Sequence, residues 1–168
     1  MISKNITIHA CAFKRYCMYE MEKMYSNQQA VVACTMNDVD PSVLSNVAFL
    51  HVKFADVISR THPDRFTVEQ AKQILSFVDQ LGPGITDLYF CCDSGESRST
   101  ALAAAFMRYL GQSQLVVWKN PQYHPNGYVY SVQCKACGML LPQLYVRHLE
   151  KVNQRAFRKQ IRLARRKE

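Results

Sequence analysis

The chain has 168 residues, a net charge of +8 and 48% hydrophobic residues, which predicts one globular domain with a sizeable core. No stretch reaches the roughly 18 to 20 apolar residues of a membrane span, and the N-terminus lacks the apolar region and cleavage site of a signal peptide. The seven cysteines are odd in number and show no disulfide-framework spacing. These patterns argue against a membrane-spanning or disulfide-stabilised secreted protein and lead us to expect a reducing, cytoplasmic location.

The positive charge is concentrated at the C-terminus. Residues 155–168 contain seven basic side chains and one acidic side chain, so they carry +6 of the net charge, and the first 154 residues are nearly neutral. We therefore expect a single domain over residues 1–152 and a basic helical extension over residues 153–168. Three interpretations of residues 155–168 stay open: a solvated end, a contact with an anionic membrane surface, and a contact with nucleic acid.

Hydrophobic periodicity and turn residues predict the elements in chain order. Strands are predicted over residues 6–8, 29–34, 47–54 and 87–91, and helices over residues 12–25, 68–81, 98–110 and from 127 onward, with a break at Pro142. Thr67 is the expected N-cap of the second of these helices. Strands separated by helices predict an α/β fold, with a central, mostly parallel sheet flanked by helices.

One loop, Cys92-Asp93-Ser94-Gly95-Glu96-Ser97-Arg98-Ser99, lies between a predicted strand and a predicted helix. Ligands of open α/β sheets bind at the carboxyl ends of strands. A helix N-terminus offers unpaired N–H groups and a positive dipole end, and a tight loop directs further N–H groups into one concavity. The loop is therefore predicted to bind an anion, with Gly95 supplying the backbone freedom of the turn.

Three side chains give this loop a chemistry. The field that binds an anion also favours a thiolate, so Cys92 is predicted to be a nucleophile. The planar guanidinium of Arg98 suits two oxygens of a phosphoryl group, and the Ser99 hydroxyl is placed to donate to the Cys92 sulfur. Asp93 and Glu96 bring carboxylates into the loop, and both are expected to face solvent.

The pattern Cys-x5-Arg-Ser, with glycine at the third x, resembles the signature loop of the cysteine-dependent protein tyrosine and dual-specificity phosphatases. The resemblance extends over residues 47–132, including Ala101 to Gly111 and Pro125-Asn126. It implies a phosphatase-like α/β fold, a cysteinyl-phosphate intermediate and a phosphorylated protein or peptide substrate, with no metal or cofactor. The chain departs from the family at Cys91, where the family usually has histidine.

The family mechanism also needs a carboxylic acid that protonates the leaving oxygen. Asp56 follows the predicted strand 47–54, which is the placement of the acid in dual-specificity phosphatases. Asp64 stands in His62-Pro63-Asp64, which resembles the Trp-Pro-Asp of other tyrosine phosphatases. Asp56 is favoured because of its position after a strand, and Asp64 stays open as the alternative acid.

Other functions remain alternatives. The same fold would suit an RNA 5′-phosphatase or a phosphoinositide phosphatase, and the residue at position 91 together with the acidic loop permits a non-catalytic phosphate-binding module. Cys134 and Cys137, with His124 or His148, have half the ligands of a zinc site. Their position in a predicted helix favours ordinary core cysteines, so no metal is expected.

Overall fold

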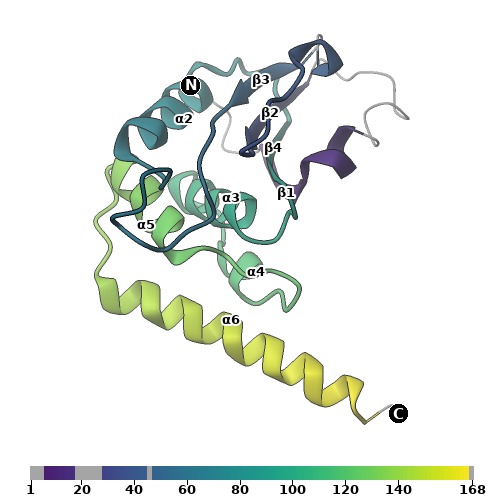
Figure 1. The fold of residues 1–168 in the computed structure, drawn as a ribbon, viewed down its shortest axis with the longest axis vertical. Coiled ribbons are helices and arrows are strands. Elements are labelled where there is room, and N and C mark those ends of the chain that lie inside the picture. The colour runs from purple at the N-terminus through teal and green to yellow at the C-terminus, as the bar shows by residue number, and fades with distance from the viewer. Residues whose placement is uncertain (1–5, 18–27, 45–46, 167–168) are drawn as a thin grey trace.

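A computed structural model describes residues 6–17, 28–44 and 47–166, and Figure 1 shows its fold. Its centre is one sheet of four strands: β1 (Thr7–Ala12), β2 (Gln29–Cys34), β3 (Ala48–His51) and β4 (Asp87–Cys92). The strand order is β1-β4-β2-β3 and every pairing is parallel. The predicted α/β class is therefore confirmed.

Parallel pairing brings the carboxyl ends of the strands to one edge of the sheet. Ala12, Cys34 and Cys92 lie level with one another at this edge, on β1, β2 and β4. Because β4 lies between β1 and β2, the residues after Cys92 emerge from the interior of the sheet. This is the position at which α/β sheets bind ligands.

Apart from the short helical segment over residues 13–17, the helices lie between β2 and β4 or after β4 in the chain. They are η1 (Pro41–Leu44), α2 (Val68–Gln80), α3 (Arg98–Tyr109), α4 (Leu115–Trp118), α5 (Gly127–Ala136) and α6 (Gln143–Ala164). Thr67 caps α2 as predicted: its side chain accepts from the Gln70 N–H, and the Gln70 side chain accepts from the Thr67 N–H. None of the helices described here is long and apolar enough to cross a bilayer.

The two faces of the sheet are covered unequally. Alternate residues of the strands, including Val32, Phe90 and Cys92, face a large core formed with α2, α3 and α5. The intervening residues, including Val31 and Cys91, face a smaller cluster around Tyr16. In Figure 1, α2, α3 and α5 lie together beside the sheet, and α6 runs along the lower side of the molecule.

Three predicted elements have different bounds in the structure. The strand predicted over residues 6–8 continues to Ala12 as β1. The strand predicted over 47–54 ends at His51, because the chain then turns away: the Ala55 N–H donates to the Asp64 carbonyl and the Lys53 carbonyl accepts from Gln70. Residues 13–17 of the predicted helix 12–25 are helical, and residues 18–25 lie outside the described residues. The break predicted at Pro142 is present, because α5 ends at Ala136 and Pro142 is the N-cap of α6.

Candidate active site

The site is built at the junction of β4 and α3. Cys92 is the last residue of β4 and Arg98 is the first residue of α3, so the strand and the helix fix the two ends of the loop. Cys92 is 1% exposed and Arg98 is 6% exposed. The two side chains predicted to carry the chemistry are thus held in the interior rather than on a free surface.

Gly95 is required at the turn of this loop. Its φ of 77° lies in the left-handed region, and a Cβ at this position would lie 2.3 Å from the backbone nitrogen of Ala12. The loop therefore packs directly against the end of β1. Only glycine combines this backbone conformation with this approach.

The sulfur of Cys92 has two polar neighbours. The Gly95 N–H donates to Cys92 Sγ at 3.2 Å, and Sγ lies 3.1 Å from the Ser99 hydroxyl, to which the thiol donates. The Ser99 hydroxyl has its own proton, which would point to the sulfur of a thiolate. The arrangement thus offers an anionic sulfur two donors, one from the turn and one from the first turn of α3.

The Arg98 guanidinium is fixed on two sides. Nη1 donates to the Phe54 carbonyl at 2.9 Å, and Nη2 forms an ion pair with the Asp93 carboxylate. Nε is also buried, but no described residue accepts its proton. A buried donor without a partner is uncommon in proteins and fits a site for an anionic ligand.

The two loop carboxylates behave differently. Glu96 is exposed, as expected, and its backbone carbonyl accepts from the Thr100 hydroxyl at 2.7 Å and from the His124 N–H at 2.8 Å. Asp93 is also exposed, but its carboxylate forms an ion pair with Arg98 and so does not face solvent alone. A phosphoryl group at the loop would compete with Asp93 for this cation.

The structure brings Asp56 to the loop. Asp56 Oδ1 accepts from the Ser97 hydroxyl at 2.9 Å and from Asn126 Nδ2 at 2.8 Å, and no described residue donates to Oδ2. The Asp64 carboxylate has no hydrogen bond or ion pair with a described residue. Its backbone carbonyl instead accepts from the Ala55 N–H at 2.7 Å.

Asn126 is a site residue that sequence reasoning missed. Its Oδ1 caps α5 by accepting from the N–H groups of Tyr128 and Val129, while its Nδ2 reaches Asp56 and the Val57 carbonyl. The sequence contained only a signal for the cap, an asparagine directly before a helix. Nothing in the local pattern indicated a partner 70 residues away.

Further thiols surround the nucleophile candidate. Burial raises the pKa of Cys34, which lies beside Cys92 on the neighbouring strand and therefore stays a neutral thiol. On the other face, Cys91 Sγ lies 3.5 Å from Cys11 Sγ. This contact lowers the pKa of Cys11 and, together with burial, raises the pKa of Cys91. Cys91 consequently supplies no charge to the site.

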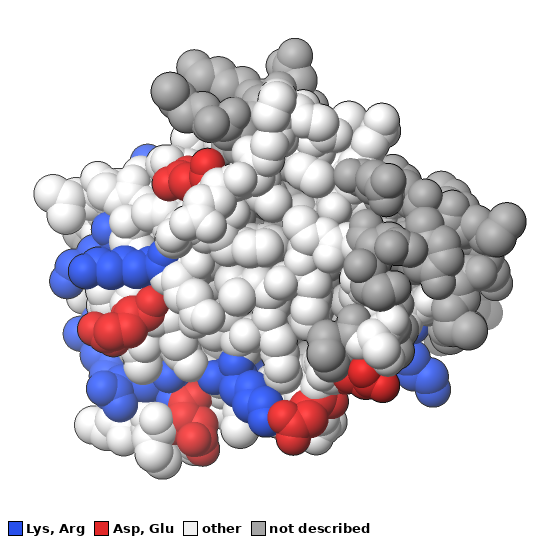
Figure 2. All heavy atoms as spheres, turned by 90° about the horizontal axis from the view of Figure 1, so that it is seen from above, with Lys and Arg blue, Asp and Glu red and all other residues white. Residues whose placement is uncertain are grey.

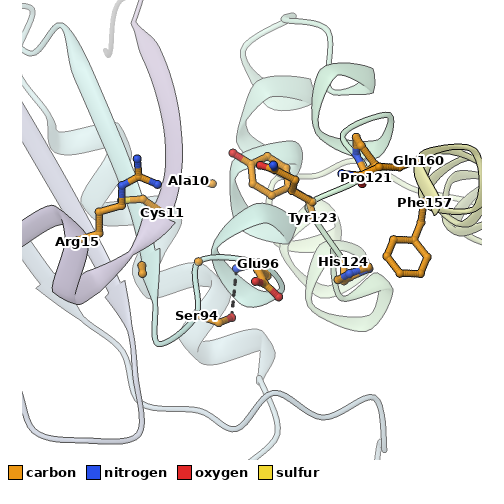
Figure 3. A pocket seen from close by; sticks show the side chains of 13 residues that line it. Ala10, Cys11, Arg15, Ser94, Glu96, Pro121, Tyr123, His124, Phe157 and Gln160 are labelled. Atoms are coloured by element: carbon orange, nitrogen blue, oxygen red, sulfur yellow. Dashed lines mark hydrogen bonds between the residues drawn. The ribbon is translucent and has the colours of Figure 1, made fainter. Parts of the chain in front are cut away.

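A cavity of about 550 Å³ opens beside the loop. Figure 3 shows Arg15 and Cys11 on one side of it and Tyr123, His124 and Phe157 on the other. The rings of His124 and Phe157 meet edge to face at 5.2 Å. Neither Cys92 nor Arg98 lines the cavity, and the loop contributes Ser94, Gly95 and Glu96 to its wall.

Cys134 and Cys137 are not part of this site. Cys134 is buried in α5 and Cys137 is the C-cap of that helix. Burial raises their pKa values to about 12 and about 11, respectively. Within the described ranges, no group of three or more His, Cys, Asp or Glu side chains is arranged to hold a metal ion.

No protein-family model and no curated protein matches the chain. Among solved structures, one match is described as "Crystal structure of Tk-PTP in the active form". It shares 19% sequence identity with this chain, with a TM-score of 0.47, over 90% of this chain and 92% of that chain. The chemistry proposed below rests on the geometry of the Cys92 loop.

Proposed function

We propose that the chain is a cysteine-dependent phosphatase that hydrolyses phosphate monoesters of proteins or peptides. The observation that carries this proposal is the convergence of three groups on one loop. The Cys92 sulfur lies beside two potential donors, Arg98 has a buried Nε with no acceptor among the described residues, and Asp56 is held at the loop rim. The resemblance of the loop to the tyrosine and dual-specificity phosphatases supports the same chemistry.

The reaction would proceed in two displacements. The Cys92 thiolate attacks phosphorus in line, the ester P–O bond breaks, and protonated Asp56 gives its proton to the leaving alcohol or phenol oxygen. Water then attacks the cysteinyl phosphate, Asp56 takes a proton from that water, and the S–P bond breaks to release phosphate. Arg98 would stabilise the charge on the transferred oxygens, and Ser99 and the Gly95 N–H would stabilise the departing sulfur.

The first prediction concerns turnover of p-nitrophenyl phosphate. Cys92→Ser is expected to lower kcat by at least about a thousandfold, because a nucleophile is lost. Arg98→Lys is expected to lower kcat/KM by about 10² to 10³, because lysine retains the charge but not the planar pair of donors. Cys137→Ser, a cysteine change outside the site, is the matched control and should retain turnover.

The same variants test the alternative of a non-catalytic phosphate-binding module, which Cys91 in place of the family's histidine and the acidic loop permit. Alkylation of Cys92 by iodoacetate, followed by mass spectrometry, reports on the site without turnover. Protection by phosphate together with no hydrolysis by the unmodified chain would establish the module instead of the enzyme. Undiminished hydrolysis by Cys92→Ser would contradict the proposed mechanism.

A further inference from the structure

The long C-terminal helix α6 has two different faces. Val146, Leu149 and Asn153 are its buried residues, and they pack against the rest of the molecule. Residues two positions apart lie on opposite sides of a helix with 3.6 residues per turn. Lys151 and Arg155 each stand two positions from Asn153, so they point away from the molecule. Arg147 is exposed at the edge of this side and lines a pocket with Gly127 and Tyr128 of α5.

These three residues begin a continuous basic face. Its members recur at intervals of three or four residues, which keeps them on one side of the helix. They are Arg147, Lys151, Arg155, Arg158, Arg162 and the C-cap residue Arg165. All six are exposed. At about 1.5 Å of rise per residue, this basic face is about 27 Å long.

The charge of the basic face is not neutralised within the described chain. No ion pair joins any of its six cations to a described carboxylate. The one acidic residue of α6, Glu150, lies against Gly127 at the start of α5. It is therefore on the side of α6 that faces the rest of the molecule. By contrast, the surface in Figure 2, viewed from the top of Figure 1, carries basic and acidic side chains interspersed along its margins.

The C-terminal half of α6 lies largely free of the other elements. Its ribbon continues past α4 in Figure 1, and every residue from Phe157 to Arg165 is exposed. The apolar side chains of this half are Phe157, at 39% exposed, Ile161 and Leu163. An interfacial membrane helix has its apolar face in the bilayer and its cations turned away from it. A partner bound through the basic face would instead meet charge without apolar contact.

We infer that the basic face of α6 binds the phosphate backbone of double-stranded nucleic acid, independently of base sequence. A duplex presents about one negative charge per 1.7 Å of axis. A duplex segment as long as the basic face, about 27 Å, therefore presents more phosphates than the six cations can contact. Single-stranded nucleic acid is bound with aromatic rings on which bases stack. The two aromatic residues of α6 instead contact other elements of the molecule: Tyr145 lies under Arg108, and Phe157 packs against His124. The observed chemistry is therefore that of phosphate contacts alone.

The test uses the full chain with the substitution Cys92→Ser. It measures binding to a fluorescently labelled 20-base-pair duplex between 50 and 200 mM salt. Because binding is read by anisotropy, the result does not depend on the proposed phosphatase activity. If all six cations contact phosphates, log K should fall with log salt with a slope of about −5. Two duplexes of unrelated sequence should bind within about twofold of each other.

The variant Arg158→Gln/Arg162→Gln/Arg165→Gln should weaken binding about tenfold or more and reduce the salt slope by about 3. Its matched control, Lys72→Gln/Lys119→Gln/Lys135→Gln, removes the same charge from exposed positions outside α6 and should bind as the parent does. Circular dichroism should show equal helix content in all three proteins. Built on the unaltered Cys92, the α6 variant should hydrolyse p-nitrophenyl phosphate at the parental rate.

Two outcomes would overturn the inference. One is no duplex binding at 50 mM salt, or equal binding by the α6 variant and the parent. The other is binding to phosphatidylserine vesicles but not to the duplex, with loss of that binding in Phe157→Ser/Ile161→Ser. The second result would identify an anionic membrane surface as the partner.

Discussion

The two candidate acids, Asp56 and Asp64, differ in what their carboxylates contact. Asp56 Oδ1 is occupied by donors from Ser97 and Asn126, which leaves Oδ2 to carry the proton that a leaving oxygen needs. Asp64 has no such placement, and its backbone carbonyl serves only to close the segment between Ala55 and Asp64. Under the proposed mechanism, Asp56 is therefore the better placed of the two carboxyl groups to transfer a proton to a substrate in the loop.

The second prediction follows from this difference. Asp56→Asn should lower kcat for phenyl phosphate, a substrate with a poor leaving group, by about 10² to 10⁴. The loss should be smaller for p-nitrophenyl phosphate, whose leaving group departs without a proton. Asp64→Asn is the matched control, and parental kinetics are expected. A larger loss in Asp64→Asn than in Asp56→Asn would reverse the assignment.

The elements around the loop show how far the sequence could predict the site. The strand before Cys92, the turn at Gly95 and the helix from Arg98 are neighbours in the chain, so local patterns predicted them. The contacts of Asp56 with Ser97 and of Asn126 with Asp56 join segments 41 and 70 residues apart. Periodicity contains no information on such pairs, because packing of the whole chain creates them.

The third prediction concerns the packing of the loop on β1. Gly95→Ala should lower stability by at least about 1 to 2 kcal/mol, because its φ of 77° is unfavourable for other residues and its Cβ would meet the Ala12 backbone. In a chain of this size, such a loss corresponds to about 2 to 8 °C in Tm. Gly111→Ala is the control, because Gly111 has a φ of 76° with nothing within 4 Å of the added Cβ.

Both glycines have a positive φ, but only Gly95 approaches the Ala12 backbone. Comparison of the two variants therefore separates the effect of this contact on stability from the effect of the backbone conformation. Gly95→Ala should have the lower Tm of the two, and it alone should lose phosphate protection of Cys92 from iodoacetate. Equal thermal shifts, measured by differential scanning calorimetry, would show that the close approach of Gly95 to β1 contributes nothing.

At the scale of the whole molecule, α6 connects regions that the sequence suggested were separate. The expected boundary between residues 152 and 153 falls inside this helix. Asn153, at that boundary, is buried, and its Nδ2 donates to the carbonyls of Trp118, Asn120 and Tyr123. The charge pattern of residues 155–168 indicated an extension, but it contained no information on what the buried side of the helix contacts.

The last prediction tests whether α6 supports the site. Asn153→Ala should lower the free energy of unfolding by about 1 to 3 kcal/mol, because the carbonyls of Trp118, Asn120 and Tyr123 lose the donor that Asn153 supplies. The segment that these carbonyls belong to also supplies the His124 N–H to the Glu96 carbonyl of the loop, so kcat/KM for p-nitrophenyl phosphate should fall as well. Gln154→Ala removes an exposed amide from the next position and should change neither quantity in urea denaturation or kinetics. Unaltered stability in Asn153→Ala would mean that α6 is attached to the α/β core without supporting it. A joint loss of stability and turnover would show that the core includes the helix at least as far as Asn153.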